Sequence, residues 1–463
     1  MDLFLIFAVL FAALAFTYTN GFHDTANAIA TVVGTKVLTP RQAIMLAAVT
    51  NLIGSFFGLA VAKTISSGLV DAQFVTQQVL ICTLVGAISW NLLTWWFGMP
   101  SSSTHALVGS LVGATLAAAV CASAAHPLLD KDGKPLSVWS SIKWKEIKDK
   151  KEKKLVPASP EILAALGNGI ATNGTHAIRL GTNSVQVVAF CGRVQQVETV
   201  VKKNGDKGGL YNKVLLPMVI SPMMGFLGGL TLMGLLYLFL RGWRPVTVNR
   251  LFGKLQLGSS AYMGFSHGMN DATKCMGIIT LALVAATSKG LFANVPGWAS
   301  WLSTSEGSDP FKLTLGATVM SWLPSWLQFG YMPNPVDVKS QGIANWVVVV
   351  CALTMAAGTA AGGWRIIRTL GHKMVKLQPI HGCAAETAGA TVLAVAASLG
   401  MPVSTTHSIT TSIMGVGCAK RFSALKLKVV ERIVWAWIMT LPATAVFAFS
   451  LVWLCNQIGW MKF

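Results

Sequence analysis

Long apolar stretches recur along the whole chain and are separated by short polar segments. A helix that crosses a membrane needs about 20 consecutive apolar residues. Stretches that approach or exceed this length cover residues 3–18, 43–62, 79–97, 214–240, 347–363 and 433–454. The pattern predicts an all-α polytopic membrane protein with about 10–12 membrane segments.

Composition supports a membrane location. Hydrophobic residues make up 53% of the chain and charged residues 11%, with a mean hydropathy of +0.59, whereas soluble proteins carry about 25% charged residues. The formal net charge of +19 would suggest nucleic acid in a soluble protein, but here most basic residues lie in loops, so no nucleic-acid partner is expected. Asp2 and the absence of Lys or Arg before the first apolar run argue against a signal peptide. Residues 3–18 are therefore expected to be retained as a first helix.

Two short motifs occur twice, in the same order. Gly-Phe-His-Asp at residues 21–24 matches Gly-Met-Asn-Asp at residues 268–271. Further on, Gly-Met-Pro-Ser-Ser-Ser-Thr-His at residues 98–105 matches Gly-Met-Pro-Val-Ser-Thr-Thr-His at residues 400–407. Two motifs repeated in order indicate duplicated halves, which are common in transporters. A longer loop near residues 291–345 accounts for the different spacing in the second half.

Basic residues gather in alternate loops. These loops lie at residues 36–41, 241–254, 365–376 and 420–432, whereas the short loop near Val70 holds only Lys63. Under the positive-inside rule, the four basic loops face the cytoplasm. The two halves then have opposite orientations, which makes an inverted-topology repeat. This arrangement predicts N- and C-termini outside a plasma (inner) membrane.

The expected organisation has five parts. The first half of the transport core covers residues 1–125, a hydrophilic basic insertion 126–212, a linking membrane helix 213–241, a basic cytoplasmic loop 242–254 and the second half of the core 255–463. The insertion lies outside in this scheme despite its basic run at 143–154, because long loops are largely exempt from the charge rule. That run is expected to be a solvated charged surface, with a basic interfacial helix over 143–155 as the alternative.

Asp24 and Asp271 each follow a long apolar run, where a charged side chain is costly and therefore marks a function. Their glycine-containing surroundings predict two broken helices. The carbonyl groups freed at each break would join the carboxylates in a site for sodium, a proton or a hydrated divalent ion. The alternative is that each Asp caps a following helix segment. Glu386 is a secondary coupling candidate in another apolar stretch, and Asn91 is a polar residue in a similar setting in the first half.

Serine and threonine cluster after Pro100 and Pro402, where new helices are expected to begin. A helix start presents free N–H groups and a positive dipole end, which together with hydroxyl donors suit phosphate or sulfate. N-capping alone explains one such cluster, but two clusters in register would bracket one anion from both sides. The candidate anion ligands are Ser102, Ser103, Thr104, Ser404, Thr405 and Thr406. His105 and His407 are supporting candidates that either orient hydroxyls or pack between helices.

The sequence contains no motif of an enzyme. It has no Walker Gly-Lys-Ser/Thr loop and no Ser/His/Asp nucleophile set, so neither ATP-driven pumping nor enzymatic chemistry is expected. No Cys or second close His completes a zinc set with His105 or His407. We therefore expect no cofactor and no permanent metal site. Polar residues concentrate in two mirrored patches rather than along one continuous pore, which argues against a passive channel.

Together these motifs resemble the inorganic phosphate transporter (PiT) family, which carries a Gly-x-Asn-Asp-x-x-Asn-type signature and a Gly-x-Pro-x-Ser-Thr/Ser-Thr/Ser-His motif in each half. The resemblance covers both repeats but not residues 126–212, and residues 20–28 are most similar to the bacterial low-affinity branch. That branch implies a symporter that imports inorganic phosphate with protons, as a neutral complex with a divalent metal. The resemblance also implies that Asp24, Asn27 and Asp271 line the cation and substrate site, and that the Ser/Thr clusters contact phosphate from two re-entrant helical hairpins. A homodimer in the lipid bilayer is a candidate assembly.

Two residues depart from the family signature. The first Asn of the signature is His23 in the first half, although Asn270 keeps it in the second, and the later Asn of the second half is Lys274. An Asp–Asn pair in each half suits a sodium ion in the sodium-coupled members. We hypothesise that the Lys274 ammonium replaces one cation, so that coupling runs on protons with His23 or Asp24 titrating. In the alternative, Lys274 only pairs with Asp271 or extends away from the site. Sodium coupling and transport of another tetrahedral oxyanion, such as sulfate, are the competing functions.

Overall fold

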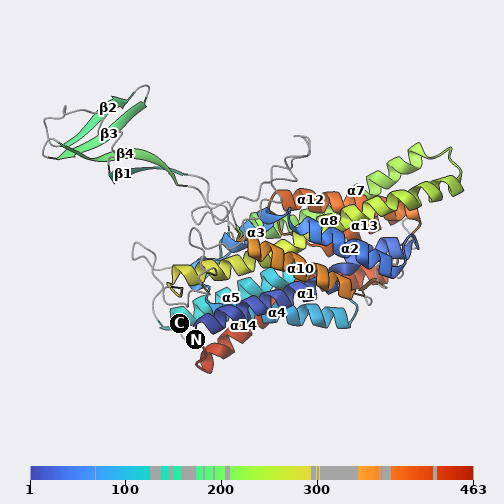
Figure 1. Ribbon diagram of the computed structural model, residues 1–463, viewed down its shortest axis with the longest axis horizontal. Coiled ribbons are helices and arrows are strands. Elements are labelled where there is room, and N and C mark those ends of the chain that lie inside the picture. The colour runs from blue at the N-terminus through green and yellow to red at the C-terminus, as the bar shows by residue number, and fades with distance from the viewer. Residues whose placement is uncertain are drawn as a thin grey trace. The chain divides into compact units, whose positions relative to one another are not determined.

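The computed structural model divides the chain into two compact units (Figure 1). Unit 1 comprises Met1–Lys145 and Gly208–Phe463, and unit 2 comprises Glu146–Lys207. The structure describes residues 2–67, 69–125, 137–144, 150–157, 174–180, 183–190, 193–203, 209–292, 299, 302, 343–363, 366–367, 377–420 and 425–461.

The described part of unit 1 is built from helices, which confirms the predicted all-α membrane architecture. In chain order the helices are α1 (Asp2–Gly34), α2 (Pro40–Ser55), α3 (Leu59–Ser67), α4 (Gln77–Trp96), α5 (Ser103–Ala125), α7 (Leu216–Phe239), α8 (Pro245–Ser288), α10 (Asn345–Ala361), α12 (Pro379–Ser398), α13 (Thr405–Lys420) and α14 (Leu427–Gln457). Short 3-10 turns cover Ala72–Phe74 and Val138–Ser141, and a π-helical turn, Tyr211–Leu215, leads into α7.

Seven of the described helices are each long and apolar enough to cross a membrane: α1, α4, α5, α7 with its π-helical turn, α8, α12 and α14. Helices α2 and α3 are bent by 63° at their junction and add an eighth span if they cross as one broken helix. The chain is therefore a multi-pass membrane protein. The number is lower than the expected 10–12 segments partly because α10 and α13, with 17 and 16 residues, are shorter than a full span.

Helices α1 and α8 run unbroken through the two Asp signatures, over 33 and 44 residues. The predicted breaks at Asp24 and Asp271 are therefore wrong. Neither signature contains proline, and a single glycine inside a helix costs only about 1 kcal/mol relative to alanine. Packing against neighbouring helices offsets a cost of that size.

The signature glycines instead permit close helix crossings. A Cβ atom on Gly21 would come within 2.7 Å of the Met355 carbonyl oxygen of α10, and one on Gly268 would collide with the Asn51 backbone of α2. Small residues at such crossings let two helix backbones approach within a membrane. These glycines therefore hold each Asp-bearing helix against a helix of the other half of the chain.

The packing of the helices is reciprocal between the halves. Helix α1 packs against α10, as α8 packs against α2. Helices α4 and α5 form one hairpin and α12 and α13 another, with α5 packed on α14 and α13 packed on α7. This reciprocal packing of equivalent helices supports the duplication that the repeated motifs indicate. The opposite orientation of the two halves remains a prediction.

Residues 245–254 were expected in a cytoplasmic loop, but they form the first turns of α8. Pro245 occupies the first turn of this helix, where the missing N–H of proline carries no penalty and its fixed φ angle is suitable. The residues before it, 240–244, make the connection from α7.

Unit 2 contains a four-stranded antiparallel sheet with the order β1-β4-β3-β2. The strands are β1 (Lys150–Pro157), β2 (Gly174–Leu180), β3 (Asn183–Phe190) and β4 (Arg193–Lys203). Lys150 pairs with Lys203 and Pro157 with Gln196. The alternative of a basic helix over 143–155 is therefore wrong, since residues 150–157 form a strand. The sequence did not indicate this strand because its partner, β4, lies far along the chain.

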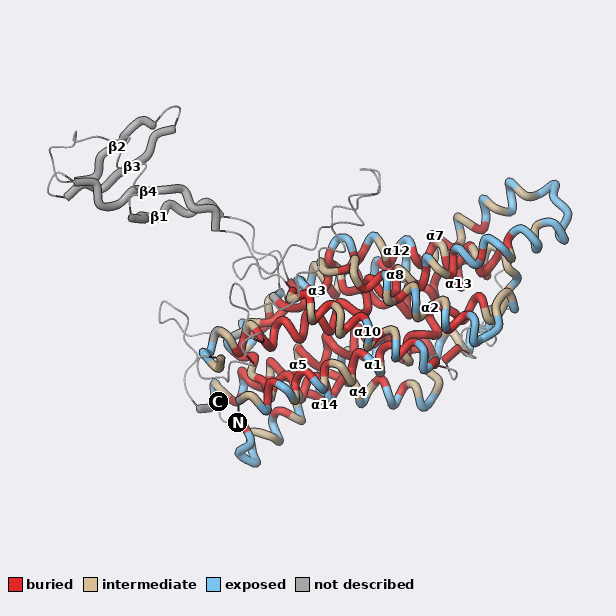
Figure 2. The backbone as a smooth tube through the Cα atoms, viewed as in Figure 1, coloured by how far each residue is buried: buried red, intermediate tan, exposed pale blue. Residues whose placement is uncertain are grey.

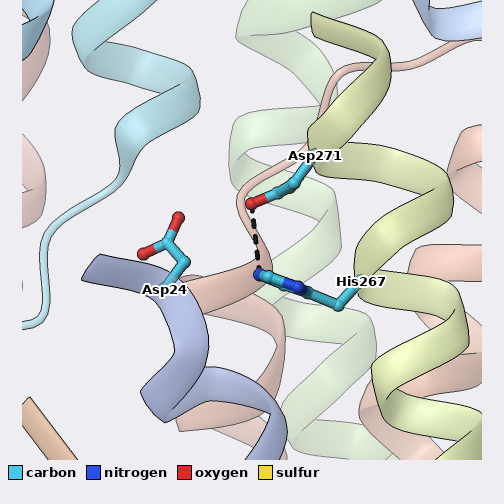
Figure 3. A group of neighbouring side chains, drawn as sticks. All are labelled: Asp24, His267 and Asp271. Carbon is cyan, nitrogen blue, oxygen red and sulfur yellow. Dashed lines mark ion pairs between the residues drawn. The ribbon is translucent and has the colours of Figure 1, made fainter. Parts of the chain in front are cut away.

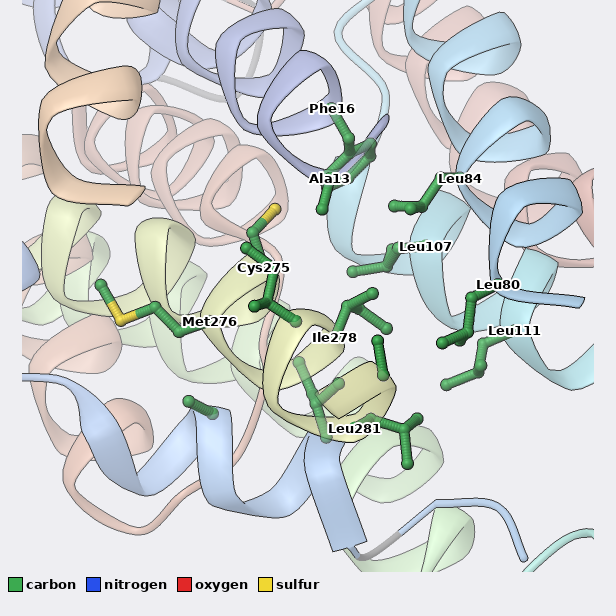
Figure 4. Close-up of a cluster of buried hydrophobic side chains, with 14 of the residues drawn as sticks. Ala13, Phe16, Leu80, Leu84, Leu107, Leu111, Cys275, Met276, Ile278 and Leu281 are labelled. Atoms are coloured by element: carbon green, nitrogen blue, oxygen red, sulfur yellow. The ribbon is translucent and has the colours of Figure 1, made fainter. Parts of the chain in front are cut away.

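Buried residues fill the interior of unit 1, whereas exposed residues predominate where α7 meets α8 (Figure 2). The largest apolar cluster joins helices of both halves, including Phe16 of α1, Leu84 of α4, Leu107 of α5 and Ile278 of α8 (Figure 4). This shared core fixes α1 and α8 beside each other, so that both Asp signatures face the same interior.

Candidate functional site

The repeated Gly-Met-Pro motifs form the tips of the two helical hairpins. Gly98 and Gly400 have φ angles of +63° and +66°, which glycine adopts without the strain a Cβ would add. The N–H of Met99 donates to the Thr94 carbonyl and that of Met401 to the Ala396 carbonyl, both at 2.9 Å. Each motif is therefore a glycine C-cap that ends one helix of its hairpin.

The first serines of the two clusters begin the next helices. The Ser102 hydroxyl oxygen accepts from the His105 N–H and that of Ser404 from the His407 N–H, both at 3.2 Å. This bond is the N-capping arrangement of a helix start. Capping uses only the oxygens of Ser102 and Ser404 as acceptors, so their hydroxyl hydrogens stay available to donate to another group.

The two hairpin tips meet each other. The Thr104 hydroxyl donates to the Val403 carbonyl at 3.1 Å, and the Thr406 hydroxyl donates to the Ser101 carbonyl at 2.9 Å. The rings of His105 and His407 lie edge to face, with centroids 4.7 Å apart. The N-terminal ends of α5 and α13 therefore converge on one place, as the repeated motifs predicted.

Asp24 of α1 contacts both tips. One carboxylate oxygen, Oδ2, accepts from Ser103 at 2.5 Å, and the other, Oδ1, accepts from Thr406 at 3.4 Å. His23 Nδ1 lies 2.8 Å from Oδ1, and the other ring nitrogen of His23 lies 3.1 Å from the Thr94 hydroxyl. Asp24 is 1% exposed, so these polar partners replace water.

Asp271 of α8 is surrounded by donors and is fully buried. Lys274 Nζ donates to its Oδ1 at 2.6 Å, and the Asn270 amide donates to the same oxygen at 2.9 Å. The second oxygen, Oδ2, lies 3.3 Å from His267 Nε2 and accepts from Thr405 at 3.4 Å. The ammonium of Lys274 is buried with the carboxylate, so the alternative that Lys274 extends away from the site is wrong, whereas the pair fits both the cation-replacement hypothesis and the alternative that Lys274 only pairs with Asp271.

Asn27 and Lys274, which align in the repeat, make different contacts. The Asn27 amide donates to the hydroxyls of Thr406 at 2.9 Å and Thr405 at 3.2 Å. Lys274 instead pairs with Asp271 at 2.6 Å. The two halves therefore contribute a neutral amide and a fixed positive charge at equivalent positions.

Asp24 of α1 lies beside His267 and Asp271 of α8, whose side chains face each other as an ion pair (Figure 3). One ligand atom from each lies within 4.8 Å of the others. Two carboxylates and an imidazole are suitable ligands for a divalent cation. The second nitrogen of His267, Nδ1, lies 2.9 Å from the Asn51 side-chain oxygen, which fixes the orientation of the ring.

His267 was not among the candidates drawn from the sequence. A signal was available, since the repeat aligns His267 with Asn20, and both are polar residues inside apolar runs. Asn51 could not have been found in this way, because its helix, α2, carries neither motif.

Glu386 of α12 lies outside this cluster and forms a second buried polar group. Its Oε1 accepts from Thr31 of α1 at 2.5 Å and from Gln256 of α8 at 3.1 Å, and its Oε2 accepts from Ser259. All these donors are neutral. Thr31 lies on the same face of α1 as Asp24 and Asn27, at the spacing of successive helical turns.

Asn91 is buried in α4, but among the described residues its side-chain amide has no hydrogen-bond partner. It does not join either polar group, so its inclusion among the supporting residues has no structural basis in these contacts. Apart from Glu386, the other predicted site residues converge on the two hairpin tips and the adjoining faces of α1 and α8.

A buried polar site that two duplicated halves of a helical membrane protein build together is the arrangement of a secondary transporter. A model of the phosphate transporter family matches residues 20–154 and 155–448. The chain belongs to the phosphate transporter family. It is accordingly a transport protein and not an enzyme.

Relatives match along nearly the full chain. A protein of Mycobacterium bovis named "Probable low-affinity inorganic phosphate transporter" is 32% identical over 100% of this chain and 85% of its own length. Proteins of the same name from Bacillus subtilis and Rhizobium meliloti are 30% and 34% identical, over 99% and 95% of this chain and 100% and 93% of their own lengths. A solved structure titled "The sodium-dependent phosphate transporter" has a similar fold, with a TM-score of 0.61 and 18% identity over 98% of this chain and 99% of that one.

Proposed function

We propose that the chain is a secondary active symporter that imports inorganic phosphate together with protons. The observation that carries this proposal is the meeting of both Asp signatures with both hairpin tips. Asp24 accepts from a hydroxyl of each tip, and Asp271 accepts from Thr405. A substrate bound here would contact both halves at once, as alternating access between two halves requires.

The hairpin tips are suited to hold the anion. The ends of α5 and α13 offer free N–H groups and positive dipole ends. Ser102 and Ser404 accept the capping bonds through their oxygens and can still donate their hydroxyl hydrogens, so we assign side-chain contacts with phosphate to them together with Ser103, Thr104, Thr405 and Thr406. The Asn27 amide, which already donates to two of these hydroxyls, orders them.

The carboxylates favour phosphate over sulfate. Phosphate near neutral pH keeps at least one proton, which Asp24 or Asp271 can accept as a hydrogen bond. Sulfate is fully ionised and can only repel a carboxylate. A site built to pair with a substrate hydroxyl rejects an analogue without one, because its own polar group is left unpaired. Sulfate is therefore the less favoured oxyanion.

Proton coupling rests on the asymmetry between the halves. Lys274 supplies a fixed positive charge at 2.6 Å from Asp271, where Asn27 stands in the other half. A resident ammonium reduces the number of external cations needed to balance the carboxylates. We assign the mobile proton to Asp24 with His23, whose side chains are 2.8 Å apart, and to Glu386.

Glu386 is suited to carry a proton between the site and the end of α1. A buried carboxylate whose donors are all neutral carries an uncompensated charge when it is ionised, and protonation removes that cost. Thr31 links it to the face of α1 that bears Asp24, and Thr35 continues that face by donating to Gln256 at 2.9 Å. A divalent metal, where it accompanies phosphate as part of the substrate, would have Asp24, His267 and Asp271 as its ligands.

The division into halves follows from the same proposal. Residues 1–125 and 255–463 would form the two halves of the transport core, with residues 213–241 as the linking helix. Reciprocal packing of α1 on α10 and α8 on α2 supports this division.

Uptake of labelled phosphate into proteoliposomes tests the substrate. Arsenate, which has the charge and protonation of phosphate, should compete strongly, and sulfate should not. Asp24→Asn and Asp271→Asn should each abolish uptake because each removes a negative charge from the site and, at residue 24, the group assigned to carry the proton. Strong competition by sulfate would favour the other oxyanion, and normal uptake by both variants would refute the site assignment.

A further inference from the structure

An apolar cavity of about 300 Å³ lies between α7 and α12. Its volume is at the small end of the range for small-molecule sites. The lining comprises Asn212, Leu216, Pro217, Ile220, Ser221 and Met224 beside and along α7, and Thr391, Val392, Val395, Ala396, Leu399, Met401 and Val403 along α12 and the tip that follows it. The cavity belongs to neither polar group described above.

The cavity has the depth of one leaflet of a bilayer. Asn212 stands at the start of the membrane-length segment Tyr211–Phe239, and Met224 lies twelve residues further, which is about 18 Å of helix. Half of the hydrocarbon core of a bilayer is about 15 Å. On α12, Leu399 lies level with Lys213, because Lys213 Nζ donates to the Leu399 carbonyl at 2.9 Å. The cavity therefore runs from one membrane surface towards the middle.

Its two ends differ in chemistry. Asn212 contributes an amide to the lining, and the neighbouring Lys213, which donates to the carbonyl of the lining residue Leu399, adds a positive charge beside that end, where a lipid headgroup would lie. The side chains beyond them are apolar and open outward, with Ile220 45% and Met224 52% exposed. In a membrane, such surfaces are covered by acyl chains. The volume suits one chain and is too small for a whole phospholipid, so the headgroup would stay at the mouth.

The inner wall of the cavity is part of the hairpin tip that faces the transport site. Val403 lines the cavity, and its carbonyl accepts from Asn270 at 2.8 Å and from Thr104 at 3.1 Å. A group that fills the cavity thus packs directly behind the backbone that holds the two tips together.

We propose that this cavity is a lipid site. It takes one acyl chain of an anionic glycerophospholipid, whose headgroup lies at Lys213, and the chain supports the α12–α13 tip from behind. Lipid binding is independent of the proposed transport function. The effect on uptake rests on that function, and the experiment separates the two.

A phosphatidylglycerol with a photoactivatable diazirine in its acyl chain serves as the probe. The full chain is reconstituted, irradiated and digested, and labelled peptides are identified by mass spectrometry. Label should concentrate on residues 212–224 and 391–403. Val392→Trp, which fills the cavity from α12, and Ile220→Trp, which fills it from α7, should each remove this label. Val219→Trp is the matched control, since Val219 is 61% exposed on α7 and does not line the cavity.

Uptake by the same variants gives a second readout. If the acyl chain supports the tip, phosphate uptake by wild-type protein should fall in vesicles of phosphatidylcholine alone and return when phosphatidylglycerol is added, whereas Ile220→Trp should lose this dependence. Equal labelling of Val392→Trp, Ile220→Trp and Val219→Trp would overturn the site. So would cross-linking of Ile220→Cys to a second copy or to another segment of the chain, because the cavity would then be a protein interface. If the wild-type protein and all variants fail to take up phosphate while the wild-type protein is still labelled, the proposed transport function is contradicted and the lipid site is not.

Discussion

The environments of two carboxylates in the first and second halves show how one duplicated site becomes asymmetric. Asp24 has hydroxyls and His23 around it, whereas Asp271 has Lys274 and His267. The sequence predicted the aspartates, the hydroxyls and Lys274, since all stand in repeated motifs. It could not predict that Lys274 turns inward, because a lysine within a membrane helix can also extend toward the surface.

Replacing Lys274 tests the role of the fixed charge. Lys274→Asn makes the second half resemble the first at this position and leaves Asp271 without its ammonium partner. Removing one partner of a buried pair costs about 3–5 kcal/mol, so thermal stability should fall. A sodium gradient should drive uptake by this variant more effectively than it drives wild-type uptake, and a proton gradient should drive it less.

Lys254→Asn is the matched control, because Lys254 is exposed on the same helix, α8. Wild-type stability and unchanged ion preference in Lys274→Asn would show that the ammonium has no part in coupling.

Replacing Glu386 separates proton movement from phosphate binding. Glu386→Gln keeps the shape of the side chain and one acceptor oxygen, for either Thr31 or Ser259, but cannot carry a proton. Proton-driven accumulation should be lost, whereas exchange of internal for external phosphate should continue, since exchange needs no net proton transfer. Glu431→Gln, at an exposed position of α14, should retain both activities, and proton-driven accumulation by Glu386→Gln would contradict its assigned role.

The two helical hairpins are the elements that assemble the site. The sequence predicted where they turn, because proline and glycine mark the ends of helices at residues 98–100 and 400–402. It misplaced the other breaks, which were expected at Asp24 and Asp271. Among the described residues of unit 1, the helices break at the two hairpin tips and at the α2–α3 junction, where Gly58 packs on Met269 of α8. Helices α1 and α8 stay intact because glycine at a crossing satisfies packing without freeing backbone groups.

Gly400 tests the conformation of one tip. Its φ angle of +66° costs a residue with a Cβ about 1–2 kcal/mol, so Gly400→Ala should lower the melting temperature and weaken phosphate uptake. The control is Gly234→Ala in α7, where a Cβ would meet nothing within 4 Å and where alanine should stabilise the helix by about 0.5–1 kcal/mol. Equal melting temperatures for the two variants would contradict this account of the tip.

The molecule combines a helical membrane unit with a separately folded insertion. The length of the apolar runs revealed the membrane unit, since a bilayer requires about 20 apolar residues in each helix that crosses it. In the sheet of unit 2 only the β1–β4 pairing joins distant segments of the chain, whereas β2–β3 and β3–β4 are hairpins with two residues between the strands, and the sequence analysis did not recognise them. The contacts of Glu386 escaped prediction because its three donors lie far from it in the sequence, on α1 and at two separate positions of α8.

Unit 2 should be dispensable for the folding of unit 1. The chain segments on either side of it are held together within unit 1, where the N–H groups of Leu210 and Tyr211 donate to the carbonyls of Lys143 and Trp144 at 2.7 Å and 3.1 Å. A short Gly/Ser linker in place of Glu146–Lys207 can therefore close the gap. The shortened protein should keep its melting temperature and its phosphate uptake, and a failure to fold would show that unit 2 contributes to the membrane unit.

Phosphate uptake into proteoliposomes, with proton and sodium gradients imposed separately, tests the central claim most directly. We predict that an inward proton gradient alone drives saturable accumulation, that a protonophore abolishes it, and that Asp24→Asn and Asp271→Asn remove it. Strict dependence on sodium, with no accumulation under a proton gradient, would contradict the account.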